Sequence, residues 1–195
     1  MRTPFLVPRI AAGDDLLLRP WHLGDLPLVR EAAEDAYIPL ITTVPSPYTH
    51  DEGVAFVLRQ EQRALSRTGY PFVVAERQGD RGLGTIGLWP NPADEGRAAV
   101  GYWLAGSARG RGIAVTALRT VASWALREQG FERLELYAEP WNAASRKTAA
   151  RAGFAYEGLL RAWQVVGGAR RDMTVYSRLA TDTDFSGTGR PDAHA

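Results

Sequence analysis

Arg109-Gly110-Arg111-Gly112-Ile113-Ala114 is the stretch that decides the fold of this chain. It follows an apolar run over residues 98–104 and precedes a long helical pattern over residues 115–126. A strand, a glycine-broken turn and a helix start in this order form an anion site, because the first N–H groups of a helix lack intrahelical partners. Glycine permits positive φ and lets a bulky anion approach the backbone. The stretch predicts a phosphate-bearing ligand, although a plain glycine turn that caps a helix fits the same residues.

The composition is that of an ordinary globular protein. The chain has 195 residues, 45% of them hydrophobic and 23% charged, and a formal net charge of +1. This charge and the single, unrepeated Arg-Gly run argue against a nucleic-acid partner. The sequence has no cysteine, which excludes disulfides, thiolate metal sites and a cysteine nucleophile. The three histidines, His22, His50 and His194, are too isolated to predict a metal site.

The ends of the chain differ in composition from its middle. The first residues carry no long apolar segment of the signal-peptide type, and no apolar run approaches membrane-spanning length, so we expect a cytoplasmic protein without a membrane partner. We expect residues 1–13 to form a loose N-terminal arm and residues 14–180 to form one domain. Residues 181–195 are rich in Asp, Gly, Thr and Pro, which predicts a disordered tail.

Hydrophobic periodicity predicts the order of elements in the domain. Strands are expected over residues 16–20, 71–76, 82–89, 98–104 and 134–138, and a closing hairpin over 154–164 and 171–179. Helices are expected over residues 25–36, 49–67, 113–129 and 142–152, and a proline-rich ordered loop over 37–48. A strand on each side of the third helix implies a parallel pair. The fold class is therefore α/β, with a mixed, mostly antiparallel sheet, one central parallel strand pair and helices on both faces.

Local strings within this order resemble the GCN5-related N-acetyltransferase (GNAT) superfamily, over residues 16–179. Within it, the chain is most similar to the ribosomal-protein-alanine acetyltransferase-like (RimJ/RimL-type) group. The strings that carry the resemblance are Leu17-Leu18-Arg19-Pro20, Pro47-Tyr48-Thr49, Gly101-Tyr102-Trp103-Leu104, Asn142-Ala143-Ala144-Ser145, Ala152-Gly153-Phe154, Glu157-Gly158, Arg171-Asp172 and Tyr176-Ser177. A P-loop or dinucleotide-binding pattern fits less well, because the Gly-Lys-Ser/Thr ending and a third glycine are missing.

The resemblance implies a splayed parallel pair and acetyl-CoA as the co-substrate. The pyrophosphate would lie on the backbone of the glycine turn, and the pantetheine arm would pair with the exposed edge of the strand before it. No metal cofactor is expected. The cofactor-binding residues implied are Tyr102, Trp103, Leu104, Arg109, Gly110, Arg111, Gly112, Ile113, Ala114, Asn142 and Ser145.

Ser145 is the candidate general acid. It shares a helix face with Asn142, three residues before it. The resemblance places Asn142 against the pantetheine and Ser145 near the thioester sulfur, where a hydroxyl can protonate the leaving thiolate. An N-cap role for Asn142 and an ordinary first-turn serine are the alternatives. Tyr137 and Tyr176 are reserve candidates for the acid.

The general base is the least defined part of the predicted site. An acceptor amine is protonated at neutral pH and must lose a proton before it attacks. Relatives often carry a glutamate two residues before the Gly-Tyr-Trp string, a position that Ala99 occupies here. Glu139 is the nearest substitute in sequence, and a solvated loop carboxylate is the alternative reading. Ordered water, Asp172 or His50 are the other options for the base.

Acceptor contacts are expected from three segments, residues 37–48, 89–91 and 163–171. The substrate-binding candidates are Tyr37, Ile38, Tyr48, Trp89 and Trp163. The predicted activity is acetyl-CoA-dependent N-acetylation of a primary amine, on a protein N-terminus or a small molecule, by direct attack in a ternary complex. Use of another acyl-CoA such as succinyl-CoA, and a non-catalytic acyl-CoA-binding or sensing protein, are the alternatives. The closing hairpin is the expected contact of a possible homodimer.

Overall fold

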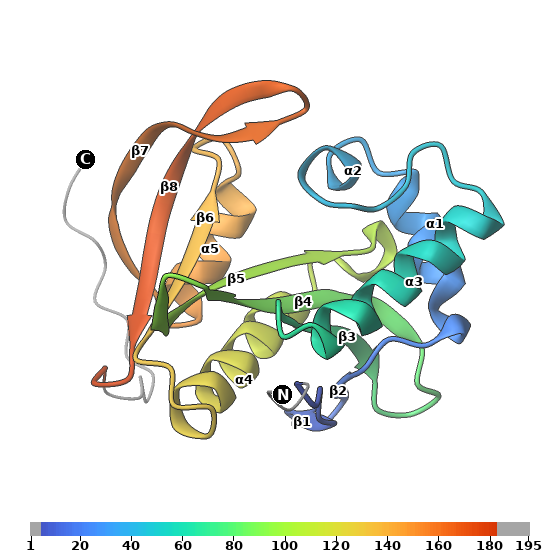
Figure 1. Ribbon diagram of the computed structural model, residues 1–195, viewed down its shortest axis with the longest axis horizontal. Coiled ribbons are helices and arrows are strands. Elements are labelled where there is room, and N and C mark those ends of the chain that lie inside the picture. The colour runs from blue at the N-terminus through green and yellow to red at the C-terminus, as the bar shows by residue number, and fades with distance from the viewer. Residues whose placement is uncertain (1–4, 183–195) are drawn as a thin grey trace.

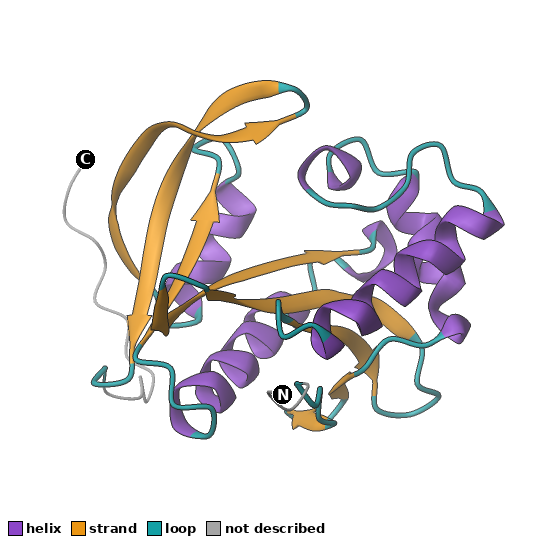
Figure 2. Ribbon diagram, viewed as in Figure 1, coloured by secondary structure: helices purple, strands orange, loops and turns teal. Residues whose placement is uncertain are grey.

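The structure, a computed structural model, describes residues 5–182 as an eight-stranded sheet with helices on both faces (Figures 1 and 2). The strands lie in the order β1-β2-β3-β4-β5-β6-β8-β7. Their bounds are β1 Ile10–Ala12, β2 Leu16–Arg19, β3 Tyr70–Glu76, β4 Gly82–Asn91, β5 Asp94–Leu104, β6 Arg133–Ala138, β7 Ala155–Val166 and β8 Ala169–Leu179. The helices are α1 Leu26–Ala33, α2 Ile38–Ile41, α3 His50–Leu65, α4 Ile113–Arg127 and α5 Ala143–Arg151, with 3₁₀ turns η1 Leu23–Asp25 and η2 Gly106–Ala108.

The parallel pair in the middle of the sheet is short. β5 and β6 pair only at Arg97↔Arg133, Ala98↔Leu134 and Ala99↔Glu135, whereas every other neighbouring pair is antiparallel. β5 then continues for five residues to Leu104 while β6 turns away, so the two strands diverge. The predicted mixed sheet with one splayed parallel pair is confirmed, and it leaves part of the β5 edge open.

Two hydrophobic clusters hold the helices to opposite faces of the sheet. α4 and α5 pack on one face, where Leu118, Val121 and Ala149 are fully buried. α1, α2 and α3 cover the other face through a second cluster that includes Val29 and Phe56. The predicted start of α3 is confirmed, since the Thr49 hydroxyl accepts a hydrogen bond from the Glu52 amide at 3.2 Å.

The N-terminal segment differs from the expectation. Ile10–Ala12 forms a strand that pairs with β2, and the Phe5 ring stacks on Tyr70 with 4.1 Å between centroids. The loose arm is therefore wrong for residues 5–13, because three residues are too few to show an alternation that predicts a strand.

The helical turn α2 also falls inside the proline-rich loop, where Pro39 is tolerated in the first turn. The expected disordered tail falls almost entirely on residues 183–195, outside the described part.

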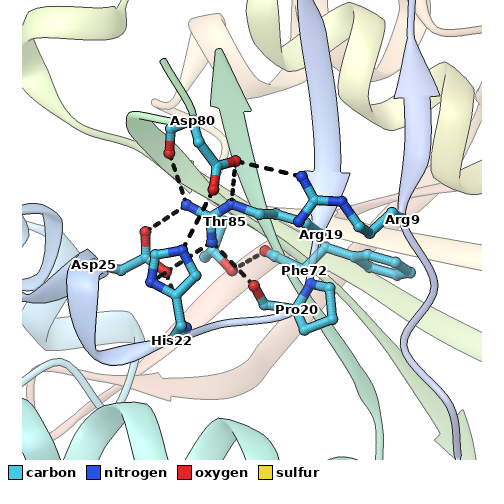
Figure 3. A network of polar contacts seen from close by, with 8 residues as sticks. All are labelled: Arg9, Arg19, Pro20, His22, Asp25, Phe72, Asp80 and Thr85. Carbon is cyan, nitrogen blue, oxygen red and sulfur yellow. Dashed lines mark hydrogen bonds and ion pairs between the residues drawn. The ribbon is translucent and has the colours of Figure 1, made fainter. Parts of the chain in front are cut away.

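A buried arginine fixes the start of α1 (Figure 3). Arg19 is completely buried and its guanidinium makes five hydrogen bonds. Two of these go to the Asp25 carboxylate at 2.7 and 2.8 Å and two go to Asp80. Burial alone would lower the pKa of Arg19, but these two aspartates raise it above its usual value. The network ties β2 to the β3–β4 turn and to the residue that begins α1.

Candidate active site

A cavity of about 570 Å³ opens where β5 and β6 diverge. Its floor is formed by β4, β5 and β6, and its walls by α3, the α2 segment and the β7–β8 hairpin. The tip of this hairpin reaches α2, where the Gly167 amide donates to the Leu40 carbonyl at 3.4 Å. The cavity therefore lies between the two halves of the molecule that Figure 1 shows on either side of the splayed strands.

The glycine turn precedes α4 with an accessible backbone. Gly110 and Gly112 have φ of 78° and 76°, and a Cβ added at either would meet nothing within 4 Å. The first helix-closing bonds run from the Val115 and Thr116 amides to the Gly112 carbonyl. The amides of Arg111 to Ala114 precede these bonds, so the turn has the open, donor-rich geometry that a pyrophosphate needs.

Arg109 has a partner that the sequence did not indicate. Its guanidinium lies 2.6 Å from the Asp35 carboxylate and also donates to the Leu104 carbonyl at 3.1 Å. Asp35 in turn accepts the Tyr37 and Ile38 amides. Burial alone would raise the pKa of Asp35, but these amides and Arg109 lower it below its usual value. Arg109 therefore joins the glycine turn to the loop that begins α2, instead of standing free beside the turn.

Adjacent aromatic residues on the free edge of β5 have different surroundings. Trp103 is buried among the residues of α1 and α3 and lies 6.4 Å from Trp21 between ring centroids, although it also touches the cavity. Tyr102 points to the opposite face and its hydroxyl lies at the cavity wall. Leu104 is half-buried at the end of the strand.

Ser145 and Tyr102 form a hydroxyl pair at this wall. The Ser145 Oγ and Tyr102 Oη atoms are 3.0 Å apart, and either can donate. Asn142 caps α5 and accepts the Ser145 amide at 3.0 Å, which holds Ser145 in the first turn. Burial raises the pKa of Tyr102, so its hydroxyl keeps its proton at neutral pH. The sequence indicated Ser145 as a proton donor but not Tyr102, which is 43 residues away along the chain.

Glu139 follows β6 and lies at the cavity wall, with 5% of its surface exposed. Its carboxylate accepts the Tyr37 hydroxyl at 2.6 Å, and the Arg171 Nε lies 4.0 Å away. Burial and the neighbouring carboxylate raise the pKa of Tyr37, which keeps that hydroxyl a donor. The α2 segment and the end of β6 therefore bring a buried carboxylate to the same cavity as the hydroxyl pair.

Glu135 of β6 pairs with Ala99 of β5. Ala99 occupies the position at which relatives often carry a glutamate. The Glu135 carboxylate accepts hydrogen bonds from Arg97, Arg133 and Tyr137 at 2.6 to 2.8 Å. Burial alone would raise the pKa of Glu135, but these donors lower it below its usual value. A carboxylate with three donors and a lowered pKa is a poor base, whereas Glu139 faces the cavity.

Of the five residues expected to contact the acceptor, three lie in or beside the cavity and two lie away from it. Tyr37 and Trp89 line the cavity. Trp163 does not line it directly, but its half-exposed ring stacks on Tyr137, which does, at 5.9 Å between centroids. Ile38 is instead buried in the core, because the α2 turn directs it inward, and we do not retain it. Tyr48 lies beneath Arg30 in a separate surface hollow and is not retained either.

Of the reserve residues, Tyr137 lines the cavity and its hydroxyl donates to Glu135 at 2.8 Å, whereas the others lie outside the lining. Tyr176 is buried in the core, and its hydroxyl accepts Arg146 at 3.4 Å. Asp172 accepts the Ala162 amide in a bulge of β7, and His50 lies beside the second hollow.

Sequence reasoning also missed cavity residues on α3, among them Gln60 and Arg63. A glutamine on the apolar face of a helix was the one signal available for them.

A mixed sheet that opens at one parallel pair, beside a glycine-rich helix start, is the architecture of the GNAT acetyltransferases. The chain belongs to this family: the acetyltransferase (GNAT) domain model matches residues 15–155. It is an N-acetyltransferase, similar to the ribosomal-protein acetyltransferases of the RimJ/RimL type.

Three relatives illustrate the similarity. The N-acetyltransferase p20 of Bacillus licheniformis, which is uncharacterized, is 28% identical over 84% of this chain and 92% of its own length. YdaF of Bacillus subtilis (strain 168), provisionally named a ribosomal N-acetyltransferase, is 35% identical, but the match covers 43% of this chain and only 45% of that protein. Mycobacterium smegmatis RimJ, solved in complex with CoA-disulfide, has a TM-score of 0.80 at 23% identity, covering 92% of this chain and 90% of RimJ.

Within residues 5–182, no group of three or more His, Asp or Glu side chains is placed to hold a metal ion. No helix of the same residues is long and apolar enough to span a bilayer.

Proposed function

We propose that this protein binds acetyl-CoA and transfers the acetyl group to a primary amine, by direct attack within a ternary complex. The observation that carries the proposal is that one cavity holds both a hydroxyl pair, Ser145–Tyr102, and a buried carboxylate, Glu139. Such a reaction needs one group to accept the proton of the amine and another to protonate the leaving sulfur. The acceptor is a protein N-terminus or a small-molecule amine.

The proposed cofactor path uses two features of the backbone. The amides of Arg111, Gly112, Ile113 and Ala114 would hold the pyrophosphate, with Gly110 and Gly112 leaving room for it. Residues 100–104 of β5 have no strand partner on the β6 side, so their edge can pair with the amide groups of the pantetheine arm. Asn142 and Ser145 would lie at the end of this path.

The proposed catalytic steps use the two ends of the reacting region. Glu139 accepts the proton that the ammonium group must lose before its nitrogen attacks the thioester carbonyl. Tyr37 donates to Glu139 and fixes its orientation. As the carbon–sulfur bond breaks, the nitrogen, now bonded to the carbonyl carbon, loses its second proton to water. Ser145 or Tyr102 donates a proton to the leaving thiolate, and the donor recovers one through the 3.0 Å contact from the second hydroxyl, which takes a proton from solvent.

The proposal is tested by titration calorimetry with acetyl-CoA, followed by a thiol-release assay over a panel of amines and N-terminal peptides. Parallel reactions with succinyl-CoA test the alternative donor. We expect acetyl-CoA to bind and at least one amine to be acetylated. Binding without transfer to any amine would favour the sensing protein, and absence of binding would overturn the proposal altogether.

Glu139→Gln tests the role of the general base separately from the binding of acetyl-CoA. The substitution keeps the shape and removes the proton acceptor, so kcat/KM for the amine should fall about 100-fold while the affinity for acetyl-CoA stays unchanged. Glu61→Gln, an exposed site on α3, is the matched control and should behave as the wild type. An unchanged kcat/KM in Glu139→Gln would remove Glu139 as the base.

A further inference from the structure

Arg63 places a cationic group at the α3 side of the cavity. Its guanidinium lies 5.1 Å above the centroid of the Trp89 ring and donates to the Gln60 side-chain oxygen at 2.8 Å. A second hydrogen bond, at 3.2 Å, goes to the Thr43 hydroxyl. All three partners are neutral, and all three line the same cavity as Arg63.

Neutral partners leave the Arg63 charge uncompensated. Among the residues that the structure describes, no carboxylate lies within ion-pair distance of its guanidinium, in contrast to Arg19, Arg109 and Arg133. Arg59, one helical turn earlier, adds a second positive charge nearby. Burial, together with Arg59, lowers the pKa of Arg63, as expected for a partly buried cation that lacks an anionic partner. An anion at this position would offset both the cost of burying the Arg63 charge and its repulsion from Arg59.

The cavity carries its two charged side chains on different strands of the sheet. Among the described residues that line it, Glu139 and Arg63 alone bear a formal charge. Arg63 stacks on the Trp89 ring, which lies over Gly87 of β4, because a Cβ added there would meet that ring at 2.4 Å. Glu139 follows β6, which is two strands away from β4. At about 4.8 Å per strand, this places the two charged groups roughly 10 Å apart across the sheet.

The rest of the cavity lining mixes apolar and polar side chains. It includes Phe56, Ile41, Tyr137 and Met173, beside the polar Thr85 and Gln164. A ligand that spans the cavity would therefore meet a carboxylate where its amine reacts and a cation at the far end. This order of chemistry is complementary to an amine that carries an acidic group at a distance.

We propose that Arg63 binds an anionic group of the acceptor, so that the preferred substrate is a primary amine with a carboxylate about 10 Å from its nitrogen. The inference rests on the proposed function and adds the substrate class to it. Guanidinium groups suit this role because they bind carboxylates through two parallel hydrogen bonds. Both a short peptide with a downstream acidic residue and a small amino acid with a long apolar spacer carry this chemistry.

The test compares matched acceptors that differ only in the acidic group. One pair is the tripeptide amides Phe-Ala-Asp and Phe-Ala-Asn, and the other is 8-aminooctanoic acid and octylamine. We expect kcat/KM with acetyl-CoA to favour the acid of at least one pair about tenfold or more, and the pair that shows it distinguishes the peptide from the small molecule. Added salt should weaken the preference.

Variants assign the preference to Arg63. Arg63→Met should bring the acid-to-neutral ratio near one, and Arg63→Lys should retain part of it. Arg59→Met removes the same charge one turn away, from a side chain outside the cavity lining, and should leave most of the ratio intact. Thermal melting checks that each variant is folded.

The outcomes separate this inference from the proposed function. If neutral amines are acetylated and neither pair shows a preference for the acid, the Arg63 assignment is wrong while the acetyltransferase proposal stands. The same holds if Arg63→Met keeps the wild-type ratio. If no member of either pair and no amine of the broader panel is acetylated, the proposed function itself fails.

Discussion

At the scale of single residues, the chemistry of the site depends on side chains that are distant in sequence. Ser145 on α5 meets Tyr102 on β5, and Glu139 after β6 meets Tyr37 before α2, 102 residues earlier. In each pair, a hydroxyl lies within hydrogen-bond distance of the group that is proposed to donate or accept a proton. The roles of the two members of a pair can be separated by removing one oxygen at a time.

Tyr102→Phe and Ser145→Ala test the hydroxyl pair. If the Tyr102 hydroxyl supplies the proton, Tyr102→Phe should lower kcat by tenfold or more at unchanged KM for acetyl-CoA, because loss of a general acid affects the transition state alone. Ser145→Ala should have a smaller effect, and the double variant should be less than additive.

Tyr176→Phe is the control for this experiment, since it removes a tyrosine hydroxyl that is buried in the core and outside the cavity lining. Steady-state rates over a range of acetyl-CoA concentrations supply kcat and KM separately. Wild-type rates in both Tyr102→Phe and Ser145→Ala would show that solvent protonates the thiolate.

Arg19→Met tests the buried network of Figure 3. The substitution leaves the buried Asp25 carboxylate without its guanidinium partner, so the free energy of unfolding should fall by about 3–5 kcal/mol. Arg81→Met breaks the largely exposed pair with Glu76 and should cost far less. Urea unfolding measures both values. Equal costs for the two variants would contradict a structural role for the Arg19 network.

At the scale of elements, the turn before α4 and the bulge in β7 shape the two ends of the site. In β7, the register shifts between Leu160 and Gln164, and Ala162 has φ of 49°. Asp172 accepts the Ala162 amide across the hairpin. The bulge lies next to Trp163, whose ring covers Tyr137 at the cavity. The hairpin was predictable from Gly167-Gly168, but a bulge of this kind leaves no periodic signal in one sequence.

Gly112→Ala tests the glycine turn. The φ of 76° is unfavourable for alanine and should lower the free energy of unfolding by about 1–2 kcal/mol. Gly79→Ala is a close control, because Gly79 has φ of 79° and an added Cβ there would also meet nothing within 4 Å.

Both glycine variants should therefore lose similar stability in thermal or urea unfolding. Only Gly112→Ala should weaken acetyl-CoA binding in calorimetry, because its methyl group would stand where the pyrophosphate approaches the backbone. Similar acetyl-CoA affinities for the two variants would argue that the turn serves only to begin the helix.

At the scale of the whole molecule, stability depends on carboxylates that are bound as anions. Arg133 and Ser177 hold Glu157 at the edge of the sheet, and their hydrogen bonds lower the pKa of Glu157 from 4.5 to about 2. Arg133 and Arg97 similarly hold Glu135. These groups join β5, β6, β7 and β8 across the sheet.

Acid should therefore destabilise the fold. A carboxyl group whose pKa is lowered on folding contributes its stability above about pH 4.5 and loses it as the pH falls toward 2. Unfolding in urea between pH 6 and pH 2.5 should show this decline, and Glu157→Gln should make the decline shallower. An identical slope for the variant and the wild type would show that Glu157 does not contribute.

The homodimer stays a prediction at this scale. Apolar side chains on the β7–β8 hairpin are about half exposed, including Leu159, Trp163 and Val165. A second copy that covered them would use the surface expected from the sequence. Sedimentation over a range of concentrations measures the association.

The sequence by itself determined the order of the elements from β2 to β8 apart from the α2 turn, the start of α3, the glycine turn and the family, because these depend on local periodicity, capping and short motifs. The tertiary structure alone decided which side chains meet: Tyr102 with Ser145, Tyr37 with Glu139, and Arg63 with Trp89. It also placed Ile38 in the core and Tyr48 outside the cavity. The physical reason is that cross-chain contacts depend on strand register and helix packing, which bring together residues that carry no signal of each other along the chain.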